Sequence, residues 1–446
     1  MTSLKKLAIR GTVWTVASYG ASLILRLGSN LILTRLLFPK LFGLMALVSI
    51  FLTGLHLFSD IGVGPSIIQN KRGDDPTFLN TAWTLQVIRG FCLWFCSLLI
   101  AWPVAKFYGD PQFLWLIPVV SLSAVISGFN STAGFTLSRH IALGKLAIFE
   151  LGLQVVSVIV TILWAWFSPT IWALVVGWLV SDLLRMVWSH RLIPGSSNRF
   201  AWDQKSVNSL FSFGRWIFLS TAMTFLGAQA DRLILGKLFS LEMLGVYSIA
   251  FNLAQMPAQL LQKISSSVIF PVVSKQADMP RALLRSKILD KRKFILAALA
   301  LPVTILISFG DKIILFLYDE RYAQASWMLP ILGFGLWITV LSSTMSPALF
   351  AIGKPLYIAY GCFFRFMLIS IGLPIIFPLV GTVGAITLIA FGDLPYYAAV
   401  VYGLWREDLM CVGQDIKTTA LFLALLTVVL MARVSTGFEL PINGLL

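Results

Sequence analysis

The chain of 446 residues is 58% hydrophobic and 12% charged, with a mean hydropathy of +0.87. No soluble fold of this length could cover so much apolar surface with polar groups, so the composition excludes a soluble globular protein and indicates a multi-pass membrane protein. The formal charge of +15 does not indicate nucleic-acid binding, because the basic residues lie in short segments between apolar stretches and form no single patch.

Apolar stretches long enough to cross a bilayer recur along the chain, and we predict an all-α fold of about thirteen membrane-spanning helices, within a range of twelve to fourteen. Six precede a polar segment: 13–34, 41–66, 82–106, 112–135, 145–167 and 170–190. Six follow it, 212–235, 243–270, 294–317, 325–351, 355–378 and 381–404, and a last apolar run lies at 417–435. The predicted domains are an N-terminal six-helix lobe at 1–195, a connector at 196–211, a C-terminal six-helix lobe at 212–405 and an additional helix at 406–446.

Lysine and arginine lie mostly in alternate segments between the predicted spans. Counted from the N-terminus, one set of segments holds twenty of these residues and the other set holds seven. The positive-inside rule therefore places the N-terminus and the long connectors in the cytoplasm, and an odd thirteenth span leaves the C-terminus outside. Because six spans per half is an even number, the two halves share one orientation and are parallel repeats.

The first two spans carry polar side chains at helical spacing. In each span these positions form one stripe on an otherwise apolar helix: Thr15, Tyr19, Ser22, Arg26 and Ser29, then Ser49, Thr53, His56 and Asp60. A charge at membrane depth costs about 3 kcal/mol or more unless it faces protein or water, so the stripes face inward. They line a hydrated cavity or pack against polar neighbours. We favour the cavity, because four or five polar groups exceed what one buried ion pair needs.

A second copy of this helix pair follows 202 residues later. Residues 29–49 align with residues 231–251, and the register holds through a charged turn. The recurring residues are Leu31, Ile32, Leu33, Leu36 and Gly43, which return as Leu233, Ile234, Leu235, Leu238 and Gly245. The chain is therefore predicted to be a duplication, with a central cavity between the halves lined by the first two helices of each.

The sequence contains no P-loop, no G-x-S-x-G motif and no H-E-x-x-H motif, and its three histidines are scattered. The cysteines show no metal-ligand spacing. We therefore predict that the protein is not an enzyme, with no catalytic residue, no metal site and no cofactor.

Four segments resemble one family of membrane transporters. They are DRLILGKLFSLEMLGVYSIAFNLAQMPAQLLQKISSSVIFPVVSK at 231–275, LTRLLFPKLFGLMALVSIF with DIGVGPSIIQ near the N-terminus, LYDERYAQASWMLPIL, and ALFAIGKP. These are similar to the polysaccharide-transporter branch of the multidrug/oligosaccharidyl-lipid/polysaccharide exporter superfamily, of the colanic and teichuronic acid exporter type. The resemblance implies translocation of a polyprenyl-diphosphate-linked oligosaccharide across the bacterial inner membrane, before polymerisation or export. Members have twelve to fourteen spans.

The predicted substrate-binding residues suit such a ligand. Cationic groups would bind the diphosphate, and amides would bind sugar hydroxyls. The candidates are Arg26, Asp60, Arg89, Arg215, Asp231 and Arg232, together with Asn252, Gln255, Gln259 and Gln262. For each arginine, a structural ion pair is as well supported as a role in ligand binding. Asp60, Asp182 and Asp231 are available as partners. For Arg365 and Asp393, at similar depth on consecutive spans, we favour a structural pair.

The alternatives are a multidrug exporter of the same superfamily, a membrane polymerase acting on the same lipid-linked sugars, and a structural scaffold. A drug exporter more often carries a compact acidic cavity. Polymerases of this kind usually hold catalysis on a large external loop, whereas the predicted outer loops here are short. The polar stripes make a scaffold the least favoured reading. A polysaccharide polymerase and export machinery are possible partners of a flippase.

The charge distribution predicts the topology directly. Reporter fusions after residues 72, 200 and 287 should give cytoplasmic signals, and fusions after residues 39, 109 and 320 should give external ones. An external signal after residue 287, in the most basic segment, would overturn the predicted orientation.

Overall fold

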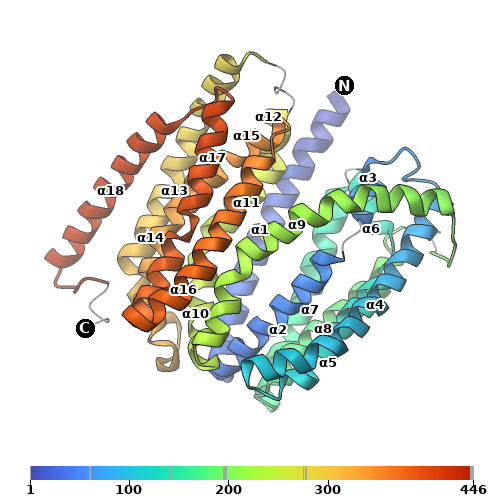
Figure 1. Cartoon of the computed structure of the whole chain (residues 1–446), viewed down its shortest axis with the longest axis horizontal. Helices are drawn as coiled ribbons and strands as arrows, with labels where there is room; N and C mark the ends of the chain where they lie inside the picture. Colours follow the sequence, from blue (N-terminus) through green and yellow to red (C-terminus); the bar gives the residue numbers. More distant parts are fainter. Residues whose placement is uncertain are drawn as a thin grey trace. The chain divides into compact units, whose positions relative to one another are not determined.

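The computed structural model describes residues 2–59, 62–140, 142–193, 198–274, 276 and 279–441, and these residues form helices and no β-strand (Figure 1). The first part of the chain forms α1 (Thr2–Leu36), α2 (Pro39–Phe58), α3 (Val63–Gln69), α4 (Pro76–Tyr108), α5 (Phe113–Gly128), α6 (Ala133–Arg139), α7 (Leu143–Phe167), α8 (Ile171–Ser189) and α9 (Gln204–Leu238). The remainder forms α10 (Leu241–Ala254), α11 (Met256–Ile264), the π-helix η1 (Ser265–Ile269), α12 (Phe270–Ser274), α13 (Arg281–Leu317), η2 (Glu320–Tyr322), α14 (Ala325–Ser343), α15 (Ser346–Ala351), α16 (Leu356–Ala390), η3 (Phe391–Asp393), α17 (Leu394–Arg406) and α18 (Val412–Ser435).

The prediction of an all-helical, multi-pass membrane protein is confirmed. Within the described residues, nine helical stretches are long and apolar enough to cross a membrane, or ten when α5 and α6, bent by 59°, count as one span. One of the nine covers residues 356–406, where Gly381 (φ 70°, ψ −154°) interrupts the helical backbone between two apolar halves. The count of thirteen stays a prediction: α10, with only 14 residues, is apolar but shorter than the helices counted.

The described chain divides into two compact units. Residues 1–37 and 44–225 form the first, and residues 38–43 and 226–446 form the second. In the first unit, α4 packs closely on α5, and α7 packs on α1 and α8. A β-carbon on Gly90 would lie 2.5 Å from the carbonyl oxygen of Ala124. Only a glycine allows these two membrane helices to approach so closely.

The segment that precedes α9 is bound to the start of α4. The backbone N–H groups of Arg199, Ala201 and Asp203 donate to Asn80 Oδ1 at 3.0 Å, Thr84 Oγ1 at 3.0 Å and Thr81 Oγ1 at 3.2 Å. Asp203 then caps α9 by accepting from the Ser206 N–H at 3.1 Å. The start of α9 is thereby held by side chains of the first unit.

Arg72 connects this cap to the cap of α4. Its guanidinium lies 2.7 Å from Asp75, the N-cap of α4, and 3.3 Å from Asp203. The hydrogen bond from Arg72 holds the pKa of the Asp75 carboxyl below its ordinary value.

The aligned glycines of the duplication meet in the second unit. A β-carbon on Gly43 would lie 1.9 Å from the carbonyl oxygen of Leu241, and one on Gly245 would lie 1.9 Å from that of Pro39. Pro39 and Leu241 are themselves aligned by the offset of 202 residues. This reciprocal pattern is the signature of a local two-fold axis between the first turns of α2 and α10.

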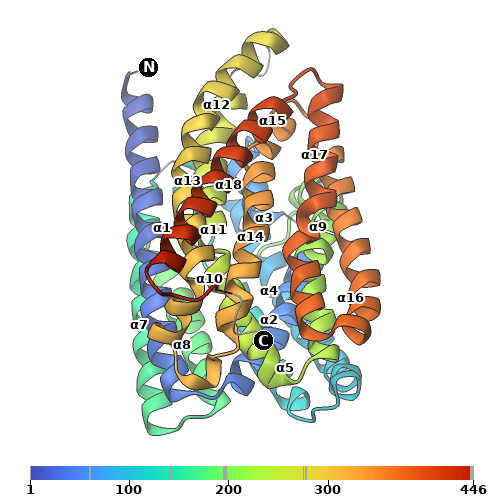
Figure 2. The same ribbon diagram turned by 90° about the vertical axis from the view of Figure 1, so that its left-hand side faces the viewer.

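The last helix, α18, belongs to the core of the second unit and lies beside α13 (Figure 1). Phe422 of α18 stacks on Trp337 of α14 with ring centroids 4.4 Å apart. The indole N–H of Trp337 also donates to Thr419 Oγ1 at 3.0 Å. Figure 2 shows α16 and α17 side by side in the same unit.

Two buried arginine–aspartate pairs join α13 to α18. Three turns into α13 and in the first turn of α18, Arg292 pairs with Asp415, and the arginine is 2% exposed. Near their ends the roles are exchanged. Arg433 of α18, also 2% exposed, donates to both oxygens of Asp311 of α13 at 2.7 and 2.6 Å.

The spacing of the two pairs matches a bilayer. Arg292 and Asp311 are 19 residues apart on α13, and Asp415 and Arg433 are 18 apart on α18. At about 1.5 Å per residue this is roughly 28 Å, close to the thickness of the hydrocarbon core. The spacing therefore suits pairs at the two boundaries of that core, and the two contacts show that α13 and α18 run parallel.

Breaking one pair should destabilise the second unit strongly. Asp415→Ala leaves Arg292 charged and buried without its carboxylate, which should cost about 3–5 kcal/mol of unfolding free energy. Thermal unfolding of the purified protein measures the loss, and Lys417→Ala, on the exposed face of the same turn, is the control. Replacing both partners, as Arg292→Met with Asp415→Leu, should recover most of the stability. A melting temperature equal to that of the control would contradict the assignment.

Candidate functional site

The structure places the predicted N-terminal site residues in different surroundings. Arg26 is exposed and lies about three turns before the end of α1. Arg89 of α4 is half-buried and donates to the His56 carbonyl oxygen at 2.6 Å and to Ser59 Oγ at 2.8 Å. It therefore binds the carboxyl end of α2, where a cation is favourable. Asp60 lies outside the described residues, as does the side chain of Arg215 within α9.

Three hydroxyls of the first polar stripes bond to the backbone of their own helices. Ser29 Oγ donates to the Arg26 carbonyl oxygen at 3.0 Å, Ser49 Oγ to that of Met45 at 2.6 Å, and Thr53 Oγ1 to that of Ser49 at 2.7 Å. Such bonds satisfy a hydroxyl within a membrane helix without a partner from elsewhere.

The predicted residues of the C-terminal half are brought together across α9 and α10. Asp231, 4% exposed, accepts a hydrogen bond of 2.5 Å from the hydroxyl of Tyr247, which is fully buried. One residue further along α9, Arg232 donates to Asn252 Oδ1 at 3.0 Å, and its guanidinium lies 4.8 Å from the centre of the Phe251 ring. An acidic and a cationic group are thus both fixed by side chains of the next helix.

A second charged pair lies in the same unit. Arg365 of α16 contacts Asp393 Oδ1 at 2.5 Å, and Thr339 of α14 donates to the other carboxylate oxygen. Asp393 ends the short 3₁₀ helix η3, which interrupts the apolar stretch before Pro395. The break places a carboxylate where a regular apolar helix would carry none.

Five of these residues form what we call the cluster: Asp231, Arg232, Tyr247, Arg365 and Asp393. Arg365 interacts electrostatically with Asp231 and Tyr247 as well as with Asp393. Two carboxylates and two guanidiniums give the cluster no net charge, which is the arrangement that lowers the cost of ionised groups at membrane depth. The Nε atoms of both arginines are buried and lack a hydrogen-bond partner among the described residues.

The four predicted amides continue from this cluster at spacings of three and four residues. Asn252 lies near the end of α10, Gln255 follows its last residue, and Gln259 and Gln262 lie on α11. Their side chains are half-buried or exposed. Amides on one edge, beginning at the residue that binds Arg232, offer donors and acceptors next to a cation.

Tyr247 and Thr339 were not predicted as members of the cluster, nor was the interaction of Arg365 with Asp231. The spacing of Asp231 and Tyr247 about the turn between α9 and α10 could have predicted their contact from the sequence. Asp231 precedes Phe239 by eight residues and Tyr247 follows it by eight, so two antiparallel helices joined there bring the pair face to face. No comparable signal exists for Thr339, which is 54 residues from Asp393.

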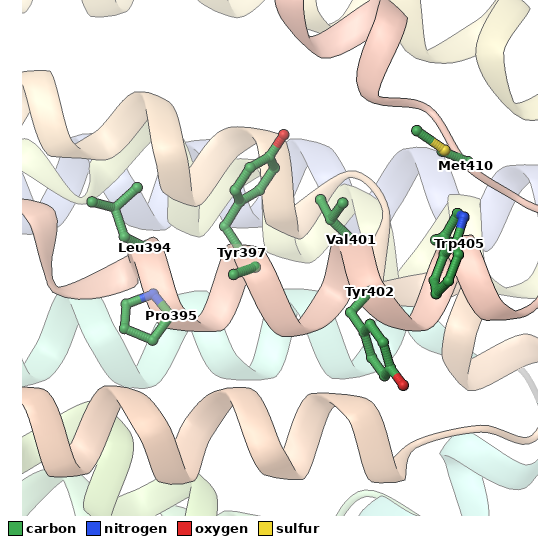
Figure 3. A pocket seen from close by; sticks show the side chains of 8 residues that line it. Leu394, Pro395, Tyr397, Val401, Tyr402, Trp405 and Met410 are labelled. Carbon is green, nitrogen blue, oxygen red and sulfur yellow. The ribbon is translucent and has the colours of Figure 1, made fainter.

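The surface of α17 carries a groove of a different character. It has a volume of about 710 Å³ and is lined by Tyr397, Val401, Tyr402, Trp405 and other mostly apolar residues at 394–410 (Figure 3). No charged side chain lines it. The groove can therefore accommodate apolar chains, whereas the ionised chemistry lies in the cluster.

The fold defines a multi-pass helical membrane protein with an ionised cluster inside one of its two units. The chain belongs to the polysaccharide biosynthesis protein family, whose model matches residues 32–327. The family predicted from the sequence motifs is thereby confirmed.

The chain is similar to curated members of several polysaccharide systems. It is 25% identical over 297 residues to the teichuronic acid biosynthesis protein TuaB of Bacillus subtilis, covering 65% of this chain and 59% of the relative. It is 23% identical over 279 residues to the lipopolysaccharide biosynthesis protein WzxC of Escherichia coli, covering 62% and 56%. It is 23% identical over 351 residues to the succinoglycan biosynthesis transport protein ExoT of Rhizobium meliloti, covering 78% and 70%. The match spans less than two thirds of the length of TuaB and of WzxC.

Solved structures share the fold. The lipid II flippase MurJ in its inward closed conformation superposes with a TM-score of 0.73 at 15% identity, covering 93% of this chain and 92% of the other. An inward-facing MATE family multidrug transporter of the MOP superfamily gives a TM-score of 0.66 at 14% identity, covering 89% and 96%. At this identity the likeness shows the fold alone.

The hydrogen bond between Tyr247 and Asp231 should be measurable as stability. Tyr247→Phe leaves a buried carboxylate without its donor and should cost about 1–3 kcal/mol of unfolding free energy, while Tyr360→Phe, at a side chain that is 51% exposed, should have little effect. Adding Asp231→Asn should recover part of the loss, because a neutral amide costs less to bury than a carboxylate. The cycle is measured by thermal unfolding of the purified variants. Equal unfolding of the two tyrosine variants would refute the pairing.

Proposed function

We propose that the protein is a flippase that moves a polyprenyl-diphosphate-linked oligosaccharide across the bacterial inner membrane by alternating access. The observation that carries the proposal is the juxtaposition of Arg232 with Asn252 and the amides that follow. A cation held between α9 and α10 suits a diphosphate, and the adjoining amides suit sugar hydroxyls.

The comparisons support the same class of substrate. The named relatives belong to teichuronic acid, lipopolysaccharide and succinoglycan biosynthesis, and the superposed structure of MurJ is described as a lipid II flippase. The product would serve synthesis of a surface polysaccharide, with a polymerase and export machinery as partners acting after it. The N-terminus is proposed to be cytoplasmic, from the distribution of lysine and arginine.

The candidate ligand-binding residues keep separate proposed roles. Arg26, Arg215 and Arg232 would attract the diphosphate, with Arg232 the best supported because its partners orient it. Asp231 and Asp60 would balance those charges. Arg89 is proposed to hold the end of α2 and to bind substrate only indirectly, because its guanidinium is already bonded to that helix.

The proposed activity is transport without bond making. Arg365 is paired with Asp393, Asp231 accepts from the Tyr247 hydroxyl and Arg232 donates to Asn252, so these contacts offer no activated nucleophile. An exporter of cationic drugs is less well supported, because the two arginines cancel the negative charge that would attract such a drug.

A deletion strain should accumulate the lipid-linked repeat unit in the cytoplasmic leaflet. Its headgroup should then resist a membrane-impermeant glycosidase added outside, and restoring the wild-type gene should make the headgroup accessible. Full accessibility in the deletion strain would show that translocation occurs without this protein and would favour a later step such as polymerisation.

Complementation separates a ligand role of Arg232 from a structural one. Arg232→Ala should abolish surface polysaccharide at unchanged protein abundance in the membrane, and Arg232→Lys should restore only part of it, because a point charge replaces a planar fork. Lys237→Ala, at an exposed position near the end of the same helix, is the control. Loss of abundance with Arg232→Ala would assign Arg232 to structure.

A further inference from the structure

A small pocket lies at the end of the second unit that contains the start of α13. It has a volume of about 190 Å³. Aliphatic side chains of α11, η1, α12 and α13 form its walls: Ile264, Ile269, Val273, Leu284, Ile288 and Ile295. Its polar lining consists of Gln276, Lys287, Lys291, Arg292 and Thr344. The pocket is separate from the cluster proposed to take part in transport.

The positive charge at this pocket is only partly neutralised. Arg292 is paired with Asp415 and donates to Thr344 Oγ1 at 2.8 Å, so it forms part of the wall. Among the described residues, neither Lys287 nor Lys291 forms an ion pair with a carboxylate. Lys287 Nζ donates to the sulfur of Met279 at 3.4 Å. Within the part of the chain that the structure describes, two lysines one helical turn apart therefore place two positive charges beside an apolar pocket.

The position of the pocket along the membrane normal follows from the two arginine–aspartate pairs between α13 and α18. The 37 residues of α13 extend for about 55 Å, whereas the hydrocarbon core is roughly 30 Å thick. Arg292 marks one boundary of that core, so the turns from Arg281 to Lys291 lie at the level of lipid headgroups. The pocket thus has its lysines among the headgroups and Ile295 toward the hydrocarbon.

The size and chemistry of the pocket select a lipid over a soluble ligand. Pockets that enclose a small molecule usually measure about 300–1,000 Å³, so this one cannot enclose such a ligand. It can hold one phosphate-bearing headgroup and the first methylenes of a chain, while the rest of the lipid stays in the bilayer. Basic residues near a membrane surface attract anionic lipids.

We infer that this pocket binds an anionic glycerophospholipid of the adjacent leaflet, with its phosphate on Lys287 and Lys291 and the upper part of one acyl chain against Leu284 and Ile288. The bound lipid would fill the pocket that residues of α12, α13 and the π-helix η1 line. Departures from α-helical geometry of this kind occur often at functional sites.

The test uses the purified full-length chain in detergent, with phosphatidylglycerol and phosphatidylcholine of identical acyl chains as probes, and native mass spectrometry as the measurement. Wild-type protein should retain phosphatidylglycerol at least ten times more tightly than phosphatidylcholine. The double variant Lys287→Gln with Lys291→Gln should lose about ten- to thirty-fold in affinity for phosphatidylglycerol, which is the loss expected for two lysines near a membrane surface.

The control removes the same charge from the same helix outside the pocket. Arg285→Gln with Lys293→Gln affects two exposed residues, one of which is paired with Asp290, and should change affinity by less than about threefold. Ile288→Trp keeps both lysines and fills the pocket, and it should weaken binding as strongly as the double variant.

Three results would overturn the inference. The first is equal retention of the two lipids by the wild type, and the second is an equal loss in the double variant and the charge-matched control. The third is displacement of phosphatidylglycerol by undecaprenyl phosphate at lower concentration, with the same dependence on Lys287 and Lys291. That result would assign the pocket to a polyprenyl lipid instead.

Discussion

The structure of the C-terminal unit depends on the cost of burying ionised arginines at membrane depth. Each guanidinium there must be met by a carboxylate or by carbonyl oxygens, because the hydrocarbon offers no water to solvate it. The carboxylate partners of three arginines lie on other elements than the arginines themselves. Arg292 and Arg433 pair with residues of another helix, and Arg365 of α16 pairs with Asp393 of η3, which follows the Gly381 break. Hydrophobic packing alone would allow apolar helices to slide or rotate against one another at little cost. An arginine–aspartate pair permits one register, so these contacts fix how the helices align.

The same constraint explains why α18 is integral to the unit. Its two pairs with α13 have opposite polarity, since α13 supplies the arginine at one end and the aspartate at the other. A shift of α18 by one turn would separate both pairs and leave four buried charges unmatched. The stacked rings of Trp337 and Phe422 add apolar contact between the two ends, but the pairs determine the position. The headgroup level inferred for Lys287 and Lys291 rests on this alignment.

Sequence alone predicts the elements of this fold well and their partners poorly. Apolar length, helical spacing and the repeat of 202 residues indicate the class of fold, the duplication and the family, because these are local properties. The pair of Arg365 and Asp393 is predictable because consecutive spans bring them to one depth. Arg292 and Arg433 lie at the edges of the predicted apolar runs 294–317 and 417–435, where nothing in the local sequence indicates a buried ion pair. Their carboxylates are more than 120 residues away, and no local pattern indicates which distant helix supplies them.

The two copies of the duplicated helix pair have kept their close contact and diverged in chemistry. Gly43 and Gly245 both remain glycine because the backbone of the opposing turn occupies the place of a β-carbon. Away from that contact, the first copy carries hydroxyls that bond to their own helices, whereas the second carries Asp231, Tyr247 and Arg232 bonded between helices. A hydroxyl that bonds to its own backbone needs no hydrogen-bond partner from another helix, whereas a buried charged group does. Divergence of the polar positions therefore concentrated oriented charge in the second copy, and this is why the argument for substrate recognition rests on Arg232 more than on Arg26.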